Sequence, residues 1–318
     1  IKMNTELNQN QPKTQVKGII FLLITAIVWG TSFVSQSVGS EVVRPFTFMG
    51  IRTLLGSFVL MPVIFVRDKI QEKSLSPSEI AHKKIKDRRT VVIGLLIGIA
   101  LCFATNFQQF AFNYSTTGKI AFITASYMFF VPISSIFFKK KLPVVTWICV
   151  LLGFIGLYFL CFKKGENFSV NRGDVLAFIC AIFFTVQILL IEKYAKTCDG
   201  IRLSCAQFFS CGLISLILMF IFERPSFVVV KSALLPILYS GIMSCGIAYT
   251  LQIIGQKYCE ATIASLIMCM ESVFATISSA IFEHKILLPR ELAGCIIMFS
   301  AILISQVYDI IKARRKIV

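Results

Sequence analysis

The stretch GIALCFATNFQQ at residues 98–109 has a counterpart, GIMSCGIAYTLQ, at residues 241–252, and this internal repeat decides the fold. A shift of 143 residues superimposes the two stretches without a gap and carries on through the next apolar segment. Seven identities fall in register: Gly98 with Gly241, Ile99 with Ile242, Cys102 with Cys245, Gln109 with Gln252, Ile120 with Ile263, Ala121 with Ala264 and Ser135 with Ser278. Each stretch lies in an apolar segment of about 20 residues, the length that crosses a bilayer as a helix. The repeat therefore predicts two related sets of membrane helices.

The composition of the whole chain agrees with a bilayer as its solvent. Of the 318 residues, 56% are hydrophobic and 15% are charged, and 30 are phenylalanine. Soluble domains usually contain about 45–50% apolar and about 25% charged residues. The mean hydropathy of +0.80 is more apolar than one or two soluble cores can bury. A water-soluble fold is therefore excluded in favour of an all-α membrane protein.

Apolar stretches of membrane-crossing length occur ten times along the chain. The predicted spans are 18–39, 45–66, 90–111, 118–138, 144–162, 173–191, 203–222, 232–254, 261–282 and 291–310. This division predicts a first five-helix unit at 18–162 and a second at 173–310. Short tails at 1–17 and 311–318 flank the two units.

Basic residues are distributed unevenly between the two sides of these spans. With the N-terminus inside the cell, 22 Lys and Arg fall on the inner side and 9 on the outer side. Positive charge accumulates on the cytoplasmic side of membrane proteins. We therefore expect a multi-pass protein of the cell membrane with both termini cytoplasmic. The same distribution explains the net charge of +16 without a nucleic-acid partner.

A second shift, of 155 residues, places the first two spans on the sixth and seventh. It sets Arg52 opposite Gln207, two polar residues at the same depth of their helices. Because five is an odd number, the second set of spans enters the membrane from the opposite side. Inverted repeats are the usual plan of secondary transporters, whose two halves open a central site alternately to each side.

Three motifs and two single polar residues, in this order, resemble a known family. The residues are AIVWGTSF at 26–33, Arg52, NRGDVLA at 171–177, Gln207 and ESVFATISSAIFEHK at 271–285. The pattern resembles the EamA-type branch of the drug/metabolite transporter superfamily over residues 18–310. This resemblance implies ten helices in two inverted halves and transport, commonly export, of small metabolites such as amino acids or of drugs. One departure is Ser272, which stands where the family often has a proline.

Two charged residues lie well inside the predicted spans, Arg52 in the second and Glu271 in the ninth. A charge inside the bilayer is costly unless it is paired or hydrated, so both are candidate substrate-binding residues. Their depths differ by about 6 Å at a rise of 1.5 Å per residue, which an arginine side chain can bridge. The alternatives are a direct or substrate-bridged pair, a purely structural ion pair, and an arginine that snorkels to backbone carbonyls. Glu271 is also the candidate carboxylate for a coupling proton.

Uncharged polar and aromatic residues complete the candidate site. Asn106 with Gln109, and Tyr249 with Gln252, sit three residues apart on one helical face. They either line an aqueous path or form hydrogen bonds between helices. Trp29 and Tyr127 offer aromatic surfaces or serve in packing.

Enzyme and metal functions find little support in this sequence. The chain has two histidines, no HExxH motif, no CxxC pair and no second carboxylate deep in a span. We therefore expect no cofactor, no metal, no catalytic residues and eleven cysteines that are small buried hydrophobes. The predicted partners are a small-molecule substrate and membrane lipids. A membrane receptor without transport, and less so an intramembrane enzyme, are the alternatives to a secondary transporter.

Two local features complete the sequence-based predictions. Ser76, Pro77 and Glu79 predict a short surface helix in the longest loop, 67–89, which either binds anionic lipid headgroups or is ordinary positive-inside sequence. Asp174 is expected to cap the sixth span.

Overall fold

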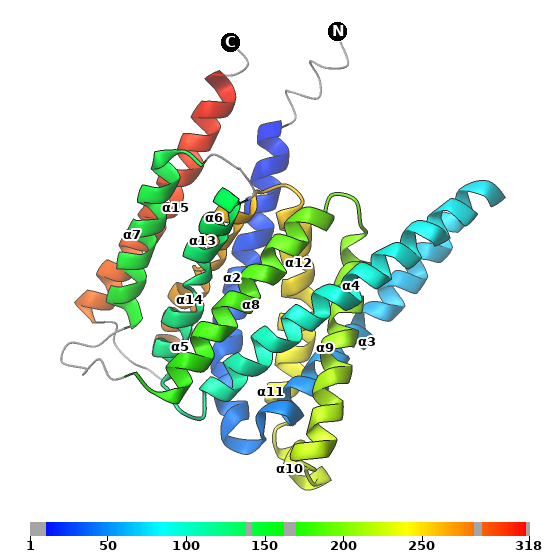
Figure 1. Ribbon diagram of the computed structural model, residues 1–318, viewed down its shortest axis with the longest axis horizontal. Coiled ribbons are helices and arrows are strands. Elements are labelled where there is room, and N and C mark those ends of the chain that lie inside the picture. The colour runs from blue at the N-terminus through cyan, green and yellow to red at the C-terminus, as the bar shows by residue number, and fades with distance from the viewer. Residues whose placement is uncertain (1–10, 138–141, 162–169, 283–287, 316–318) are drawn as a thin grey trace.

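The computed structural model describes residues 11–137, 142–161, 170–282 and 288–315, and within them the chain is all-helical (Figure 1). The predicted span ends at Phe138 and Phe162 and residues 1–10 and 316–318 of the tails lie outside the described ranges. The helices are α2 (Gln11–Val42), α3 (Pro45–Glu72), α4 (Pro77–Ala111), α5 (Thr117–Thr124), α6 (Tyr127–Phe137), α7 (Val144–Cys161), α8 (Arg172–Tyr194), α9 (Gly200–Phe222), α10 (Phe227–Ser232), α11 (Leu234–Tyr239), the π-helix η1 (Ser240–Ala248), α12 (Tyr249–Gln256), α13 (Ala261–Met268), α14 (Glu271–Phe282) and α15 (Pro289–Arg315).

The burial pattern is that of a membrane protein. Eight helical segments of the described chain are long and apolar enough to span a bilayer. Large apolar side chains such as Leu96 and Phe220 are about 60% exposed on the outer surface. Polar side chains lie inside instead. Gln109 and Gln207, for example, are fully buried. An apolar exterior, with polar side chains such as these kept inside the bundle, is the arrangement that a bilayer favours. The predicted spans 144–162 and 291–310 are helical as α7 and α15, but α7 is short and neither is among the eight.

The two predicted five-helix units are interleaved in space. Helices α3 and α4 pack against α9, α2 packs against α14, and α7 lies beside α15 at one flank of the bundle (Figure 1). The described start of α2 and the described end of α15 lie at the same end of the bundle.

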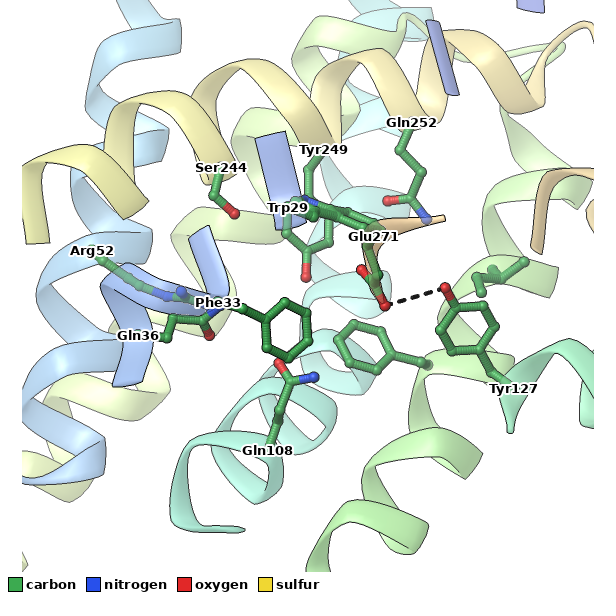
Figure 2. A pocket seen from close by; sticks show the side chains of 12 residues that line it. Trp29, Phe33, Gln36, Arg52, Gln108, Tyr127, Ser244, Tyr249, Gln252 and Glu271 are labelled. Atoms are coloured by element: carbon green, nitrogen blue, oxygen red, sulfur yellow. Dashed lines mark hydrogen bonds between the residues drawn. The ribbon is translucent and has the colours of Figure 1, made fainter. Parts of the chain in front are cut away.

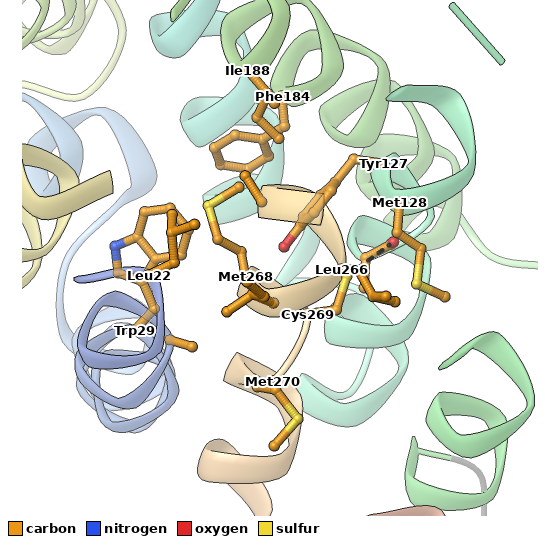
Figure 3. Close-up of a cluster of buried hydrophobic side chains, with 14 of the residues drawn as sticks. Leu22, Trp29, Tyr127, Met128, Phe184, Ile188, Leu266, Met268, Cys269 and Met270 are labelled. Carbon is orange, nitrogen blue, oxygen red and sulfur yellow. Dashed lines mark hydrogen bonds between the residues drawn. The ribbon is translucent and has the colours of Figure 1, made fainter. Parts of the chain in front are cut away.

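Two spans are interrupted near their middle. Helix α5 gives way to α6 at Ala125 and Ser126, and α13 gives way to α14 at Cys269 and Met270. At both places the backbone makes three-residue hydrogen bonds, such as Met128 N–H to Ala125 O at 3.0 Å, which tighten the turn as in a 3₁₀-helix. The two interruptions touch, because the Cys269 thiol donates to Ala125 O at 3.7 Å. Figure 3 shows the core side chains around this junction.

Ser272 takes part in the second interruption. Its backbone N–H donates to Cys269 O at 3.2 Å. A proline has no N–H to donate, so the serine allows a hydrogen bond here that the family's usual residue could not make.

The surface helix predicted in the 67–89 loop does not exist as a separate element. The capping box is present: the Ser76 hydroxyl accepts from the Glu79 N–H, and the Glu79 carboxylate accepts from the Ser76 N–H at 2.8 Å. The helix that it starts nevertheless runs on without a break as α4 through to Ala111. No glycine or proline separates the loop from the span at Arg89 and Thr90, so nothing ends the helix there.

Asp174 and Glu223 are two of the carboxylates that accept N–H groups at the start of a helix. Asp174 and Asn171 form the capping box of α8, which confirms the predicted cap, and Lys119 Nζ lies 2.6 Å from the Asp174 carboxylate. Glu223 at the end of α9 accepts the N–H groups of Phe46 and Thr47 at 2.9 and 2.7 Å. The second contact ties the start of α3 to α9.

The close crossing of α4 and α9 gives a test of the helix packing. A methyl group added at Gly98 would lie 2.4 Å from Gln207 O, so G98A must push the helices apart. We expect a lower unfolding midpoint in detergent and a loss of about 1–3 kcal/mol, the usual cost of overpacking. The matched control is G246A, because a methyl group there comes no closer than 3.6 Å to its neighbours. Equal midpoints for the two variants would contradict the close crossing.

Candidate substrate cavity

A cavity lies inside the bundle, between elements from both predicted units (Figure 2). Its lining residues are Trp29, Phe33, Gln36, Arg52, Gln108, Tyr127, Phe184, Ile188, Ser244, Tyr249, Gln252 and Glu271. Its free volume is about 30 Å³. That is room for about two water molecules, whereas pockets that hold small ligands measure about 300–1,000 Å³. The lining side chains therefore close the cavity and leave no space for a small ligand.

Glu271 is the acidic residue of this lining. It is the first residue of α14, directly after the helix interruption, and it is 5% exposed. The Tyr127 hydroxyl, at the start of α6, donates to Glu271 Oε1 at 3.4 Å. Each interruption is thus followed by a polar side chain that lines the cavity, Tyr127 in one span and Glu271 in the other.

Arg52 lies on another side of the same cavity. It is 2% exposed, its guanidinium carbon lies 5.4 Å from the centre of the Phe48 ring, and its Nε and Nη1 atoms are buried without a hydrogen-bond partner. No hydrogen bond or ion pair joins these described atoms to Glu271, and Figure 2 shows Phe33 between the two residues. The direct pair that the matching depths allowed is therefore absent in this conformation.

Aromatic rings form much of the cavity wall. The Trp29 and Tyr249 ring centres lie 4.5 Å apart, and Tyr127 meets Phe184 edge to face at 6.3 Å. Trp29 reaches this position because its neighbour Gly30 lets α2 touch α14: a methyl group at Gly30 would lie 2.8 Å from Glu271 O. Helix α2 therefore lies against α14 directly beside Glu271.

Amide side chains divide between the cavity and the helix interfaces. Gln252 reaches the cavity and exchanges hydrogen bonds with Gln187 at 3.3 and 3.5 Å. Asn106 instead donates to the Ser215 hydroxyl at 2.8 Å, and Gln109 donates to Gln36 O at 3.3 Å. These two residues join helices and do not line the cavity.

The structure therefore gathers six of the eight predicted site residues: Trp29, Arg52, Tyr127, Tyr249, Gln252 and Glu271. The lining residues that sequence reasoning missed are Phe33, Gln36, Gln108, Phe184, Ile188 and Ser244. The shift of 155 residues relates three of them, Phe33, Phe184 and Ile188, to other lining residues. It places Trp29 on Phe184 and Phe33 on Ile188, and all four line the cavity.

No metal-binding cluster occurs among the described residues, and ten of the eleven cysteines are free thiols, eight of them buried. The cavity thus presents one carboxylate, one guanidinium, aromatic faces and amides. This set suits the reversible binding of a small amphipathic molecule.

Comparison with known proteins gives a consistent result. The EamA-like transporter family matches residues 16–162 and again residues 171–306. An uncharacterized transporter of Archaeoglobus fulgidus is 27% identical over 284 residues, which cover 89% of this chain and 83% of that protein. An uncharacterized transporter of Clostridium kluyveri is 25% identical over 271 residues (82% and 84%), and the uncharacterized transporter YoaV of Bacillus subtilis is 23% identical over 264 residues (82% and 86%). A solved crystal structure with 17% identity superimposes with a TM-score of 0.73 over 95% of this chain and 98% of that one, so the fold is shared.

Proposed function

Because the chain belongs to the EamA-like transporter family and is a membrane transporter, we propose that it exports a small amphipathic metabolite by alternating access. The substrate would be of the amino acid or amphipathic drug class and would bind in the central cavity. Solute or proton gradients would supply the energy, because the sequence has no nucleotide-binding motif.

The closed cavity is the observation that carries this proposal. A buried site lined by Arg52 and Glu271 has no room for a solute in the present conformation. A solute can enter only if the surrounding helices move, which is the requirement of alternating access and not of an open channel. The unpartnered Arg52 N–H groups suit an anionic group of the solute, and Glu271 suits an amine.

Matched elements support ten spans in two inverted repeats. The family matches two successive segments, 16–162 and 171–306. Helices α5 and α13 are both eight residues long, and both are followed by an interruption. An offset of 144 residues pairs Thr117 with Ala261 and Tyr127 with Glu271. This is one more than the sequence shift of 143, as expected if the π-helix η1 contains one inserted residue.

The proposal is tested by a binding screen followed by flux. Purified protein is screened by thermal shift against amino acids, nucleosides and cationic drugs, since a bound ligand raises the unfolding midpoint. Each hit is then loaded into proteoliposomes, and its movement is followed with and without a pH gradient. Gradient-driven flux supports a secondary transporter. Binding without flux would favour a receptor instead.

Orientation can be tested separately with single cysteines in a cysteine-free background. Leu75 lies between α3 and α4, and Ser226 lies between α9 and α10. If both termini are cytoplasmic, L75C should resist a membrane-impermeant thiol reagent in intact cells and S226C should react. The opposite labelling pattern would invert the topology.

A further inference from the structure

We propose that a groove between α4 and α8 is a binding site for an anionic phospholipid. The groove is lined by Ile85, Arg88, Arg89, Val92, Ile93 and Tyr194, and its volume is about 450 Å³. It lies where α4 enters the predicted span at Thr90, which is the depth of the lipid headgroups. We call it the hairpin groove, because α3 and α4 form a helical hairpin that projects sideways from the bundle (Figure 1).

The carboxylates of this hairpin are all engaged within the protein. Asp68 binds Lys83 at 3.0 Å and Arg202 at 2.5 Å, and Asp87 binds Arg202 at 3.0 Å. The other two acidic residues of segment 65–89 also have partners. The Glu72 carboxylate lies 3.7 Å from Lys83 Nζ, and Glu79 caps α4.

The remaining basic side chains of segment 65–89 face outward without an acidic partner. Lys69, Lys73, Lys84, Lys86, Arg88 and Arg89 make no ion pair with any described residue. Lys193 adds a further charge at the hairpin groove, because its ammonium group lies over the Tyr194 ring at 5.2 Å from the ring centre. The hairpin thus engages its carboxylates in contacts within the protein and presents unpaired positive charge outward.

Apolar side chains lie beside these charges. Ile85 is 70% exposed, and Val92, two turns further along α4, is 51% exposed. A soluble anion would leave them in contact with water, whereas a phospholipid places a phosphate at Arg88 and Arg89 and acyl carbons against Ile85 and Val92. Basic clusters with neighbouring apolar groups at a membrane surface recognise anionic lipid in this way.

The test uses the full-length protein in detergent micelles, titrated with palmitoyl-oleoyl phosphatidylglycerol while the unfolding midpoint is recorded. The lipid should stabilise the wild type, and R88Q/R89Q should need about 30-fold more lipid for the same shift. The control K17Q/K257Q removes the same charge from exposed sites outside the hairpin groove, and its affinity should stay within about threefold of the wild type. Both variants should unfold like the wild type without added lipid, because the replaced side chains make no ion pairs.

Three outcomes would overturn the proposal. Equal stabilisation by palmitoyl-oleoyl phosphatidylcholine would mean that the protein does not recognise the negative charge of the headgroup. Equal losses in the two double variants would mean that only the overall charge matters. Stabilisation by inorganic phosphate at the concentration at which the lipid acts would identify a site for a soluble anion.

Discussion

Replacing Glu271 by glutamine should leave a folded protein whose transport no longer responds to a pH gradient. Among the residues that line the cavity, Glu271 is the acidic one, and it is almost fully buried. Glutamine keeps the shape of the side chain and an oxygen that can accept from the Tyr127 hydroxyl. It cannot exchange a proton or balance the charge of a substrate amine, so gradient-driven flux should fall to the level of protein-free vesicles.

The measurement compares flux per folded molecule in proteoliposomes across pH 5.5 to 8, together with the unfolding midpoint. The matched control is E260Q, because Glu260 precedes α13 and is exposed, and its side chain makes no capping hydrogen bond. E260Q should transport like the wild type. If E271Q keeps pH-dependent flux, Glu271 is not the coupling group; if it only loses stability, its role is structural.

Replacing Arg52 by methionine should weaken substrate binding by about tenfold or more without lowering stability. A hydrogen bond to a charged group contributes about 1.5–3 kcal/mol. Loss of the guanidinium should therefore reduce the binding free energy of an anionic solute by at least that amount. Stability should hold because Arg52 is buried with two N–H groups unpartnered, a costly state that an apolar side chain relieves.

A second arginine provides the contrast for this experiment. Arg202 is paired with Asp68 and Asp87, so R202Q leaves two partly buried carboxylates short of a partner. We expect R202Q to lose about 1 kcal/mol of stability and to keep its solute affinity. Thermal unfolding and ligand titration on both variants decide the matter. A large drop in the R52M midpoint at unchanged affinity would assign Arg52 a structural role.

Prediction from the sequence was most accurate for those features that cost the most free energy to place in a membrane. Membrane spans are recognisable because every backbone polar group in lipid must be bonded within a helix. Arg52 and Glu271 stood out because buried charge in a membrane is expensive, and both line the cavity. A depth difference that an arginine side chain can bridge does not fix the lateral distance between two helices, which is why the direct pairing of Arg52 with Glu271 did not follow.

Other parts of the cavity carried no comparable signal. Phe33 and Ile188 are apolar residues in apolar helices, and composition cannot separate a lining side chain from a packed one. The choice of Gln109 over its neighbour Gln108 came from a gapless shift of 143 residues. The offset of 144 pairs Gln108 with Gln252, and both line the cavity. A π-helix that inserts one residue is invisible to a gapless comparison.

If solute binds in the closed cavity, as we propose, the need for opening should also limit how quickly it is captured. Because the present conformation holds only about two waters, an encounter succeeds only with molecules that are already open. The observed association rate should then stop rising with solute concentration and level off at the intrinsic opening rate. Under the proposed alternating access, the affinity measured for a solute should likewise be weaker than that of the open form, in proportion to the fraction of molecules that are open. Under this proposal, tight binding and fast capture should depend on the energy of opening as much as on the side chains that touch the solute.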